Sequence, residues 1–227
     1  MTAYRLVIAD DHPLIRDALR LTIAQTFPDA AIAEADSFDS LRASLEAADD
    51  TDLVLLDLNM PGMQGFQGLL FLRAQYAAVP VAIISASDEP RTIRLALELG
   101  AIGYIAKSAT PGEIRAALTA LLAGKVWTSA QVDLRRAEDP EAELALRLAR
   151  LTPQQVRVLM MLSDGLANKQ IAHALDVSEA TVKAHVSAVL QKLDAGNRTQ
   201  AVILARRLAA ELGPPPAPAA RPMRRGG

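Results

Sequence analysis

The stretch Asp52-Leu-Val-Leu-Leu-Asp57-Leu-Asn-Met-Pro-Gly62 decides the fold. An unbroken aliphatic run between two aspartates, followed by a proline–glycine turn, is typical of a strand that is buried on both faces. Strands of this kind occur in parallel sheets that helices cover. The stretch therefore predicts the central strand of an α/β domain, with Asp57 at the carboxyl end of that strand.

The sequence around this stretch alternates short apolar runs with longer segments of helical period, as in a parallel sheet covered by helices. The predicted strands are 4–9, 30–35, 52–57, 79–85 and 102–106, and the predicted helices are 12–27, 37–48, 66–76, 89–99 and 111–123. Thr110-Pro-Gly-Glu113 is a capping box, and Gly100 suits a left-handed helix cap. These five repeats of strand and helix define a first domain over residues 1–124.

A linker and a smaller helical unit are predicted after this domain. In residues 125–149 the periodicity fades and charges accumulate, so we expect a linker that ends in a short helix over 141–150. Thr152-Pro-Gln-Gln155 is a second capping box. The predicted helices of the second domain, which covers 150–212, are 153–163, 168–175, 179–193 and 199–212. Residues 213–227 are rich in proline, alanine and arginine, and we expect them to be disordered.

Composition and charge narrow the class of protein. The chain has 227 residues and no cysteine, which excludes disulfides and suits a reducing compartment such as the cytoplasm. We expect neither a membrane-spanning helix nor a signal peptide. Residues 1–150 carry 14 basic and 21 acidic side chains, a balance of −7, whereas 151–227 carry 10 and 5, a balance of +5. An acidic domain joined to a basic one suits contact with a polyanion but does not prove it.

Polar residues stand where predicted strands end. Asp10 and Asp11 follow the first strand, Asp57 ends the third, Ser85 ends the fourth, and Lys107 follows the fifth. Ligands of open parallel sheets bind at this edge, and clustered carboxylates favour a hard cation such as Mg²⁺. One carboxylate, Asp57, can then act as a nucleophile toward a phosphoryl group while a lysine and a hydroxyl hold its oxygens. Taken singly, an aspartate at either position is more often a helix N-cap, and it is the set of residues at four strand ends that indicates a site.

These residues carry a resemblance to the receiver domain of two-component response regulators. The matching segments are Asp10-Asp11, Asp57 with Met60-Pro-Gly, Ser85-Ala, and Gly103-Tyr-Ile-Ala-Lys107. The resemblance implies a flavodoxin-like fold, with a five-stranded parallel sheet in the order 2-1-3-4-5. It also implies that a histidine kinase phosphorylates Asp57, with Mg²⁺ held by Asp11, Asp57 and the backbone carbonyl of Asn59, and with Asp10 supporting the metal site.

The resemblance further assigns Ser85 and Tyr104 to a switch pair. In the family the hydroxyl turns toward the new phosphoryl group, and the aromatic ring follows it inward. A tyrosine in a strand more often serves ordinary core or edge packing, so the switch role rests on motif position. Ser108 follows Lys107 where many receivers have proline. Because a non-proline cis bond costs about 3 kcal/mol, the geometry of this peptide bond is left open.

The second domain contains a helix-turn-helix pattern over 168–193, in which Ser178 caps the second helix. One face of that helix is apolar. The opposite face carries Ala180, Thr181, Ala184, Ser187, Ala188 and Gln191, with Lys183 and Lys192 at its edges. Small residues let a helix approach base edges, and lysines reach phosphates or guanine acceptors. An amphipathic helix that merely faces water is the alternative.

The second domain resembles the LuxR/NarL-type DNA-binding domain. The resemblance rests on Gly165-Leu-Ala-Asn-Lys-Gln-Ile-Ala, Ser178-Glu-Ala-Thr-Val-Lys-Ala-His and Asn197-Arg-Thr-Gln-Ala, among other segments. By motif position Lys183, Ala184 and Ser187 face the major groove of double-stranded DNA. Those placed near the DNA backbone are Lys169, Thr181, Lys192, Arg198 and Thr199. Basic residues common in the family are missing at Ala180 and Gln191, which predicts weak unassisted binding.

Together the two resemblances predict a response regulator that is a transcription factor of a phosphorelay and not an enzyme. We expect phosphorylation of Asp57 to control dimerisation and DNA binding, with a sensor histidine kinase as partner, RNA polymerase as a possible one, and a homodimer on DNA. One alternative is a regulator that partner binding controls without phosphorylation. A second is a Mg²⁺-dependent phosphatase, which would leave the helix-turn-helix unexplained.

Overall fold

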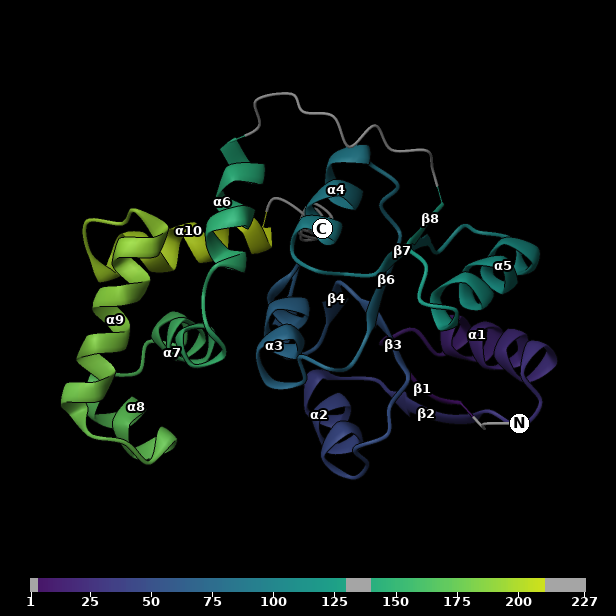
Figure 1. Ribbon diagram of the computed structural model, residues 1–227, viewed down its shortest axis with the longest axis horizontal. Coiled ribbons are helices and arrows are strands. Elements are labelled where there is room, and N and C mark those ends of the chain that lie inside the picture. Colours follow the sequence, from purple (N-terminus) through teal and green to yellow (C-terminus); the bar gives the residue numbers. More distant parts are fainter. Residues whose placement is uncertain (1–3, 130–139, 211–227) are drawn as a thin grey trace, which may run out of the picture.

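The computed structural model describes residues 4–129 and 140–210, and it places a helix-covered sheet beside a group of helices (Figure 1). The sheet is parallel and has the strand order β2-β1-β3-β6-β7-β8. Its strands are β1 (Arg5–Ala9), β2 (Ala31–Ala35), β3 (Leu53–Asp57), β6 (Val81–Ser85), β7 (Gly103–Ala106) and β8 (Trp127–Thr128). The first five, taken in chain order, confirm the predicted order 2-1-3-4-5.

Helices cover both faces of the sheet, which is why every residue of β3 and β6 is buried. The helices α1 (Pro13–Thr26) and α5 (Pro111–Leu122) pack on one face through Leu19, Ile23 and Leu118. The other face is covered by α2 (Phe38–Glu46), α3 (Gln67–Gln75) and α4 (Pro90–Glu98). Thr110 forms the predicted capping box with Glu113 at the start of α5.

The prediction of five strands was incomplete. Asn59–Met60 and Met63–Gln64 form a small antiparallel hairpin, β4 and β5, directly after Asp57. Residues 127–128, predicted as part of an irregular linker, form the sixth strand β8 on the edge of the sheet. Such short strands carry no periodic signal, because backbone pairing alone places them.

The C-terminal unit is helical, as predicted. It contains α6 (Pro140–Ala149), α7 (Pro153–Ser163), α8 (Asn168–Leu175), α9 (Glu179–Leu193) and α10 (Arg198–Ala210). Ser178 accepts a hydrogen bond from Thr181 N–H and caps α9, while Asp176 and Asp194 adopt left-handed conformations at the ends of α8 and α9. The predicted disordered tail 213–227 lies outside the described residues. Within the described ranges, no helix combines the length and apolar character needed to cross a bilayer.

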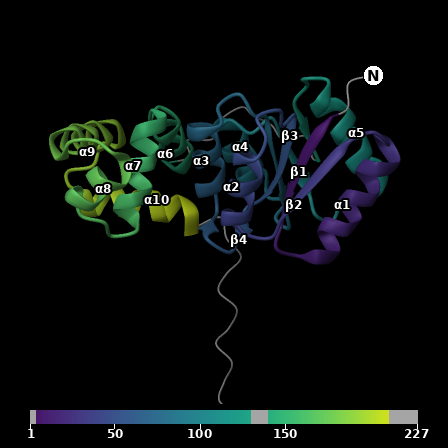
Figure 2. The same cartoon turned by 90° about the horizontal axis from the view of Figure 1, so that it is seen from below.

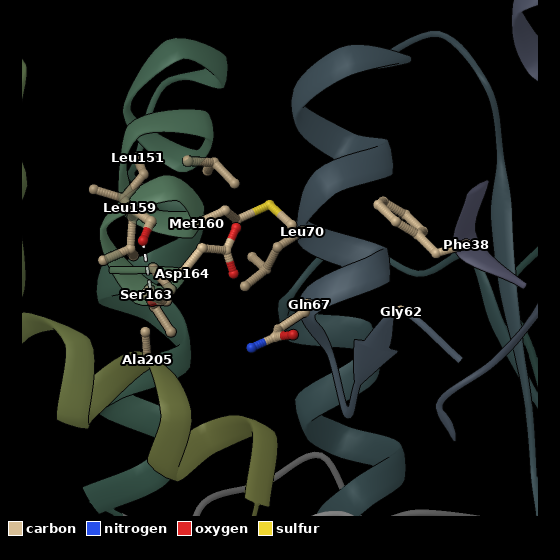
Figure 3. A pocket seen from close by; sticks show the side chains of 12 residues that line it. Phe38, Gly62, Gln67, Leu70, Leu151, Leu159, Met160, Ser163, Asp164 and Ala205 are labelled. Atoms are coloured by element: carbon tan, nitrogen blue, oxygen red, sulfur yellow. Dashed lines mark hydrogen bonds between the residues drawn. The ribbon is translucent and has the colours of Figure 1, made fainter. Parts of the chain in front are cut away.

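Among the described residues, the most extensive contacts between the two units involve four helices. On one side α7 packs on α3, and on the other α6 packs on α4 while also contacting α9 and α10. Arg147 of α6 donates to the Leu193 carbonyl at the end of α9, at 3.3 Å. A cavity of about 210 Å³ remains between α3 and α7, where Leu70 and Gln67 lie opposite Met160 and Asp164 (Figure 3). In both orthogonal views α9 lies at the end of the molecule away from the sheet (Figures 1 and 2).

Candidate functional site

An acidic cluster forms where β1 and β3 end. Ligand atoms of Asp10, Asp11, His12 and Asp57 all lie within 4.8 Å of one another. Asp10 and Asp57 are almost fully buried, with 1% and 2% of their surface exposed. Because parallel strands present their carboxyl ends at one edge, the sheet order brings the predicted acidic residues together.

Lys107 joins this cluster from the end of β7. Its Nζ lies 2.8 Å from Asp10 Oδ2 and 2.8 Å from Asp57 Oδ2. Burial acts to lower the pKa of Lys107, but its hydrogen bonds and ion pairs with the two carboxylates outweigh burial and raise it overall. Lys107 is therefore a fixed cation beside the Asp57 carboxylate.

The Asp57 carboxyl is ionised only at a cost. Burial raises its pKa above the ordinary value, and the neighbouring charge of Asp10 acts in the same direction. The hydrogen bond and charge of Lys107 oppose this shift, as does a hydrogen bond with the backbone of Asn59. One lysine thus leaves the negative charge of the cluster incompletely balanced.

The donor set of the cluster suits a hard divalent cation. Asp10, Asp11 and Asp57 offer carboxylate oxygens, which Mg²⁺ prefers, and their shared charge favours a bound cation. His12 was not among the predicted site residues, although it directly follows the acidic pair. Its Nδ1 lies 2.6 Å from Asp11 Oδ1 and 3.2 Å from Asp10 Oδ1, while its ring is 65% exposed.

The two residues of the predicted switch pair lie on β6 and β7, next to each other in the sheet. Ser85 is buried and pairs with Ala106 in the strand register, at the level of Lys107. Tyr104 is fully buried, and its hydroxyl donates to Ser87 O at 2.8 Å. Burial raises the pKa of Tyr104 to about 12. Because it is buried, the Tyr104 ring lies in the inward position that the receiver resemblance associates with a phosphorylated site.

The peptide bond between Lys107 and Ser108, whose geometry the sequence left open, is trans.

A second candidate site is the outer face of α9. Thr181, Lys183, Ala184 and Ser187 are all exposed along it. The Lys183 ammonium lies 3.4 Å from Glu179 Oε1 one turn earlier, in a solvent-exposed pair. The opposite face buries Val182, Val189 and Leu193 against the rest of the domain. Lys169 on α8 and Thr199 on α10 are exposed as well.

Two of the cationic side chains predicted to lie near DNA, those of Lys192 and Arg198, form hydrogen bonds with other groups of the protein. Lys192 Nζ donates to Arg150 O and to Gln155 Oε1, both at 2.8 Å. Arg198 Nη2 donates to Leu166 O at 2.5 Å. These bonds hold the first turn of α7 and the loop before α8, so contact with a phosphate would have to use the remaining N–H groups. The sequence alone offered no signal for these tertiary hydrogen bonds.

Comparisons with known proteins identify both domains. Residues 6–119 match the response regulator receiver domain, and 149–205 match the luxR family of bacterial regulatory proteins. The chain is 41% identical to the glycerol metabolism activator of Pseudomonas putida over 89% of this chain and 95% of that protein. It is 33% identical to the nitrate/nitrite response regulator NarL of Escherichia coli over 87% of this chain and 93% of NarL.

Solved structures show the same fold. The chain resembles RcsB in a structure of two dimers bound to two parallel DNAs, with a TM-score of 0.54, 22% identity, and coverage of 90% of this chain and 98% of that one. The isolated receiver domain of RcsB from Salmonella enterica, with a phosphomimetic present, matches with a TM-score of 0.54 at 24% identity. That match covers 58% of this chain and 96% of the other.

Proposed function

The chain belongs to the LuxR-type response regulators of two-component systems, a family of DNA-binding transcription regulators, and from this premise we propose that phosphorylation of Asp57 controls it. The observation that carries the proposal is the contact of Lys107 Nζ with Asp57 Oδ2 at 2.8 Å inside the acidic cluster. A nucleophilic carboxylate, a fixed cation and oxygen ligands for a metal are the parts that an aspartyl phosphate needs.

In the proposed reaction an Asp57 carboxylate oxygen forms a bond to phosphorus as the bond from phosphorus to the donor nitrogen of a kinase phosphohistidine breaks. Lys107 compensates charge on the transferred oxygens, and the Ser85 hydroxyl binds one of them. Asp10, Asp11, Asp57 and the Asn59 carbonyl are the groups that would hold Mg²⁺, whose charge offsets that of the incoming phosphoryl group. The proposed switch role of Tyr104 is then to hold its ring in the buried position once the Ser85 hydroxyl binds the phosphoryl group.

Phosphorylation by a small phosphodonor tests the assignment. With Mg²⁺ and phosphoramidate, we expect one slowly migrating species on a Phos-tag gel for the wild-type protein and none for Asp57→Ala. Asp49→Ala is the matched control, because this exposed aspartate lies before β3, at the opposite edge of the sheet. We expect chelation of Mg²⁺ to abolish the modified species. Modification of Asp57→Ala to the wild-type extent would refute the assignment.

The output proposed for this switch is a homodimer on double-stranded DNA in the cytoplasm, with a sensor histidine kinase as the phosphodonor and RNA polymerase as a further partner. Lys183, Ala184 and Ser187 would enter the major groove, with Lys169, Thr181 and Thr199 near the DNA backbone. The exposure of these side chains supports the proposal. In this proposal residues 1–124 are the receiver, 125–149 connect the domains through β8 and α6, and 150–212 bind DNA.

The alternative of a phosphorylation-independent regulator shares this output. It predicts that Asp57→Ala binds operator DNA as the wild-type protein does, both before and after treatment with phosphodonor. The position of Lys107 beside Asp57 inside the acidic cluster favours phosphorylation, because a cation held there can compensate the charge of phosphoryl oxygens. The phosphatase alternative is set aside, since the family is one of transcription regulators.

A further inference from the structure

The strand β8 lies beyond the repeats of strand and helix, and backbone bonds to β7 hold it on the sheet. In its register Trp127 pairs with Gly103 and Thr128 pairs with Tyr104. Ser129 N–H continues the ladder and donates to Tyr104 O at 3.1 Å. Residues 127–129 are therefore paired with the strand that carries Tyr104 and leads into Lys107.

The Ser129 hydroxyl extends this pairing to Ala106, the residue before Lys107. Ser129 Oγ accepts a hydrogen bond from Ala106 N–H at 2.8 Å, and it lies 3.4 Å from Tyr104 O. Ala106 is 6% exposed, so its N–H needs a partner within the protein. The hydroxyl thus takes the place of a backbone carbonyl beside the residue that directly precedes Lys107.

Gly103 makes the close approach of β8 possible. A Cβ atom at this position would lie 2.9 Å from Trp127 O and 2.6 Å from Leu121 Cδ2. Both distances are shorter than real Cβ contacts, and the first involves backbone that cannot turn aside. Glycine at this position lets β8 form on the edge of β7.

Lys107 is consequently anchored from two sides. Its own N–H donates to Ser85 O on β6 at 2.7 Å, and the preceding residue is bound by Ser129 from the outer edge. A movement of the Lys107 backbone toward a phosphoryl oxygen would therefore act on both contacts. The outer contact belongs to the segment that leaves the receiver toward the DNA-binding domain.

We propose that Ser129 is a positioning residue, which ties the backbone before Lys107 to β8 so that occupation of the phosphoryl site changes the environment of β8. The inference rests on the proposed function, because it takes Lys107 as a phosphoryl-binding residue. It adds a role for a serine outside the acidic cluster and outside the Ser85 and Tyr104 pair.

The single tryptophan of the chain, Trp127, lies in β8 and reports on this strand by fluorescence. We expect titration of the full-length wild-type protein with beryllofluoride in Mg²⁺ to give a saturable change in Trp127 emission. Ser129→Val should lose more than half of this change, although the analogue still raises its melting temperature. Ser129→Thr retains the hydroxyl and should keep the wild-type response.

A Ser129→Val protein with the wild-type fluorescence change and midpoint would overturn the proposal. If this variant does not fold, exchange of the Ala106 amide in the wild-type protein decides. Greater protection on binding of the analogue supports the proposal, and unchanged exchange contradicts it. If beryllofluoride stabilises the wild-type protein through Asp57 but Trp127 does not respond, this inference alone fails. If there is no stabilisation through Asp57, the proposed phosphoryl-acceptor function fails and the inference falls with it.

Discussion

The ionised Asp57 carboxylate, which the proposed phosphorylation requires, lowers the stability of the folded protein. Its carboxylate is buried beside that of Asp10, and Lys107 must serve both. Because burial and the charge of Asp10 raise the pKa of Asp57, the folded protein binds a proton at this position more tightly than the unfolded chain does. The contribution of Asp57 to stability is therefore greatest when the carboxyl is protonated, and it declines as the pH rises through the raised pKa.

We accordingly predict that Asp57→Asn melts at a higher temperature than wild type at neutral pH, by about 2–8 °C. The difference should be smallest at pH values below the ordinary pKa of aspartate, roughly 3.9, and should grow toward neutrality as Asp57 ionises. Thermal denaturation across this pH range in the absence of divalent ions measures it. A variant less stable than wild type at neutral pH would contradict the sign of the pKa shift.

Mg²⁺ offers a matched control for this result. Its binding should raise the melting temperature of wild type in proportion to the logarithm of its concentration, because it binds the folded state. Asp57→Asn should respond much less, since one of the carboxylate ligands is gone. An equal response of both proteins would place the ion elsewhere.

At the scale of elements, α9 presents few cations for a DNA-binding helix. Lys183 is exposed, whereas Lys192 holds Arg150 O and Gln155 Oε1. Since each phosphate contact adds to the salt dependence of binding, the domain should bind DNA with a shallow salt slope. The two lysines of this helix should therefore respond differently to substitution.

Lys183→Ala should weaken binding to a selected operator by roughly 5- to 150-fold and relax the preference at one base pair, as expected for loss of a guanine contact worth about 1–3 kcal/mol. Lys169→Ala should weaken all sequences alike and lower the salt slope by about one. Lys192→Ala should instead lower the melting temperature with little change in salt slope. Binding isotherms at several salt concentrations separate these outcomes. A smaller salt dependence of binding for Lys192→Ala would show that Lys192 contacts a DNA phosphate.

The sequence predicted those elements that bury a regular apolar pattern. The run before Asp57 and the capping boxes at Thr110 and Thr152 were sufficient because they depend on local residues, and the acidic cluster follows once strands are parallel. The strand β8 and the hydrogen bonds of Lys192 and Arg198 were beyond prediction. They depend on partners distant in sequence, and no periodicity marks them.

The two domains of the molecule are joined by elements next to the acidic cluster. The helix α3 begins at Gln67, soon after Asp57, and packs on α7, while α4 follows β6 and packs on α6. The side chains between α3 and α7 are not closely packed, because a cavity lies among them. Among the described residues, the exposed face of α9 takes no part in this contact. The proposed function therefore assigns control to dimerisation and not to occlusion of α9 by the receiver.

A charge placed in the contact distinguishes these mechanisms. Leu70→Glu sets a carboxylate opposite Met160 and Asp164, which should separate the domains and raise the radius of gyration measured by X-ray scattering. We predict that the affinity of the unphosphorylated variant for a single half-site stays within about twofold of wild type, a change below 0.5 kcal/mol. Leu21→Glu, at a leucine of α1 that is 58% exposed, is the control for an added charge. A tenfold gain in affinity of Leu70→Glu, without the same gain in the control, would show that the docked receiver masks the DNA-binding face after all.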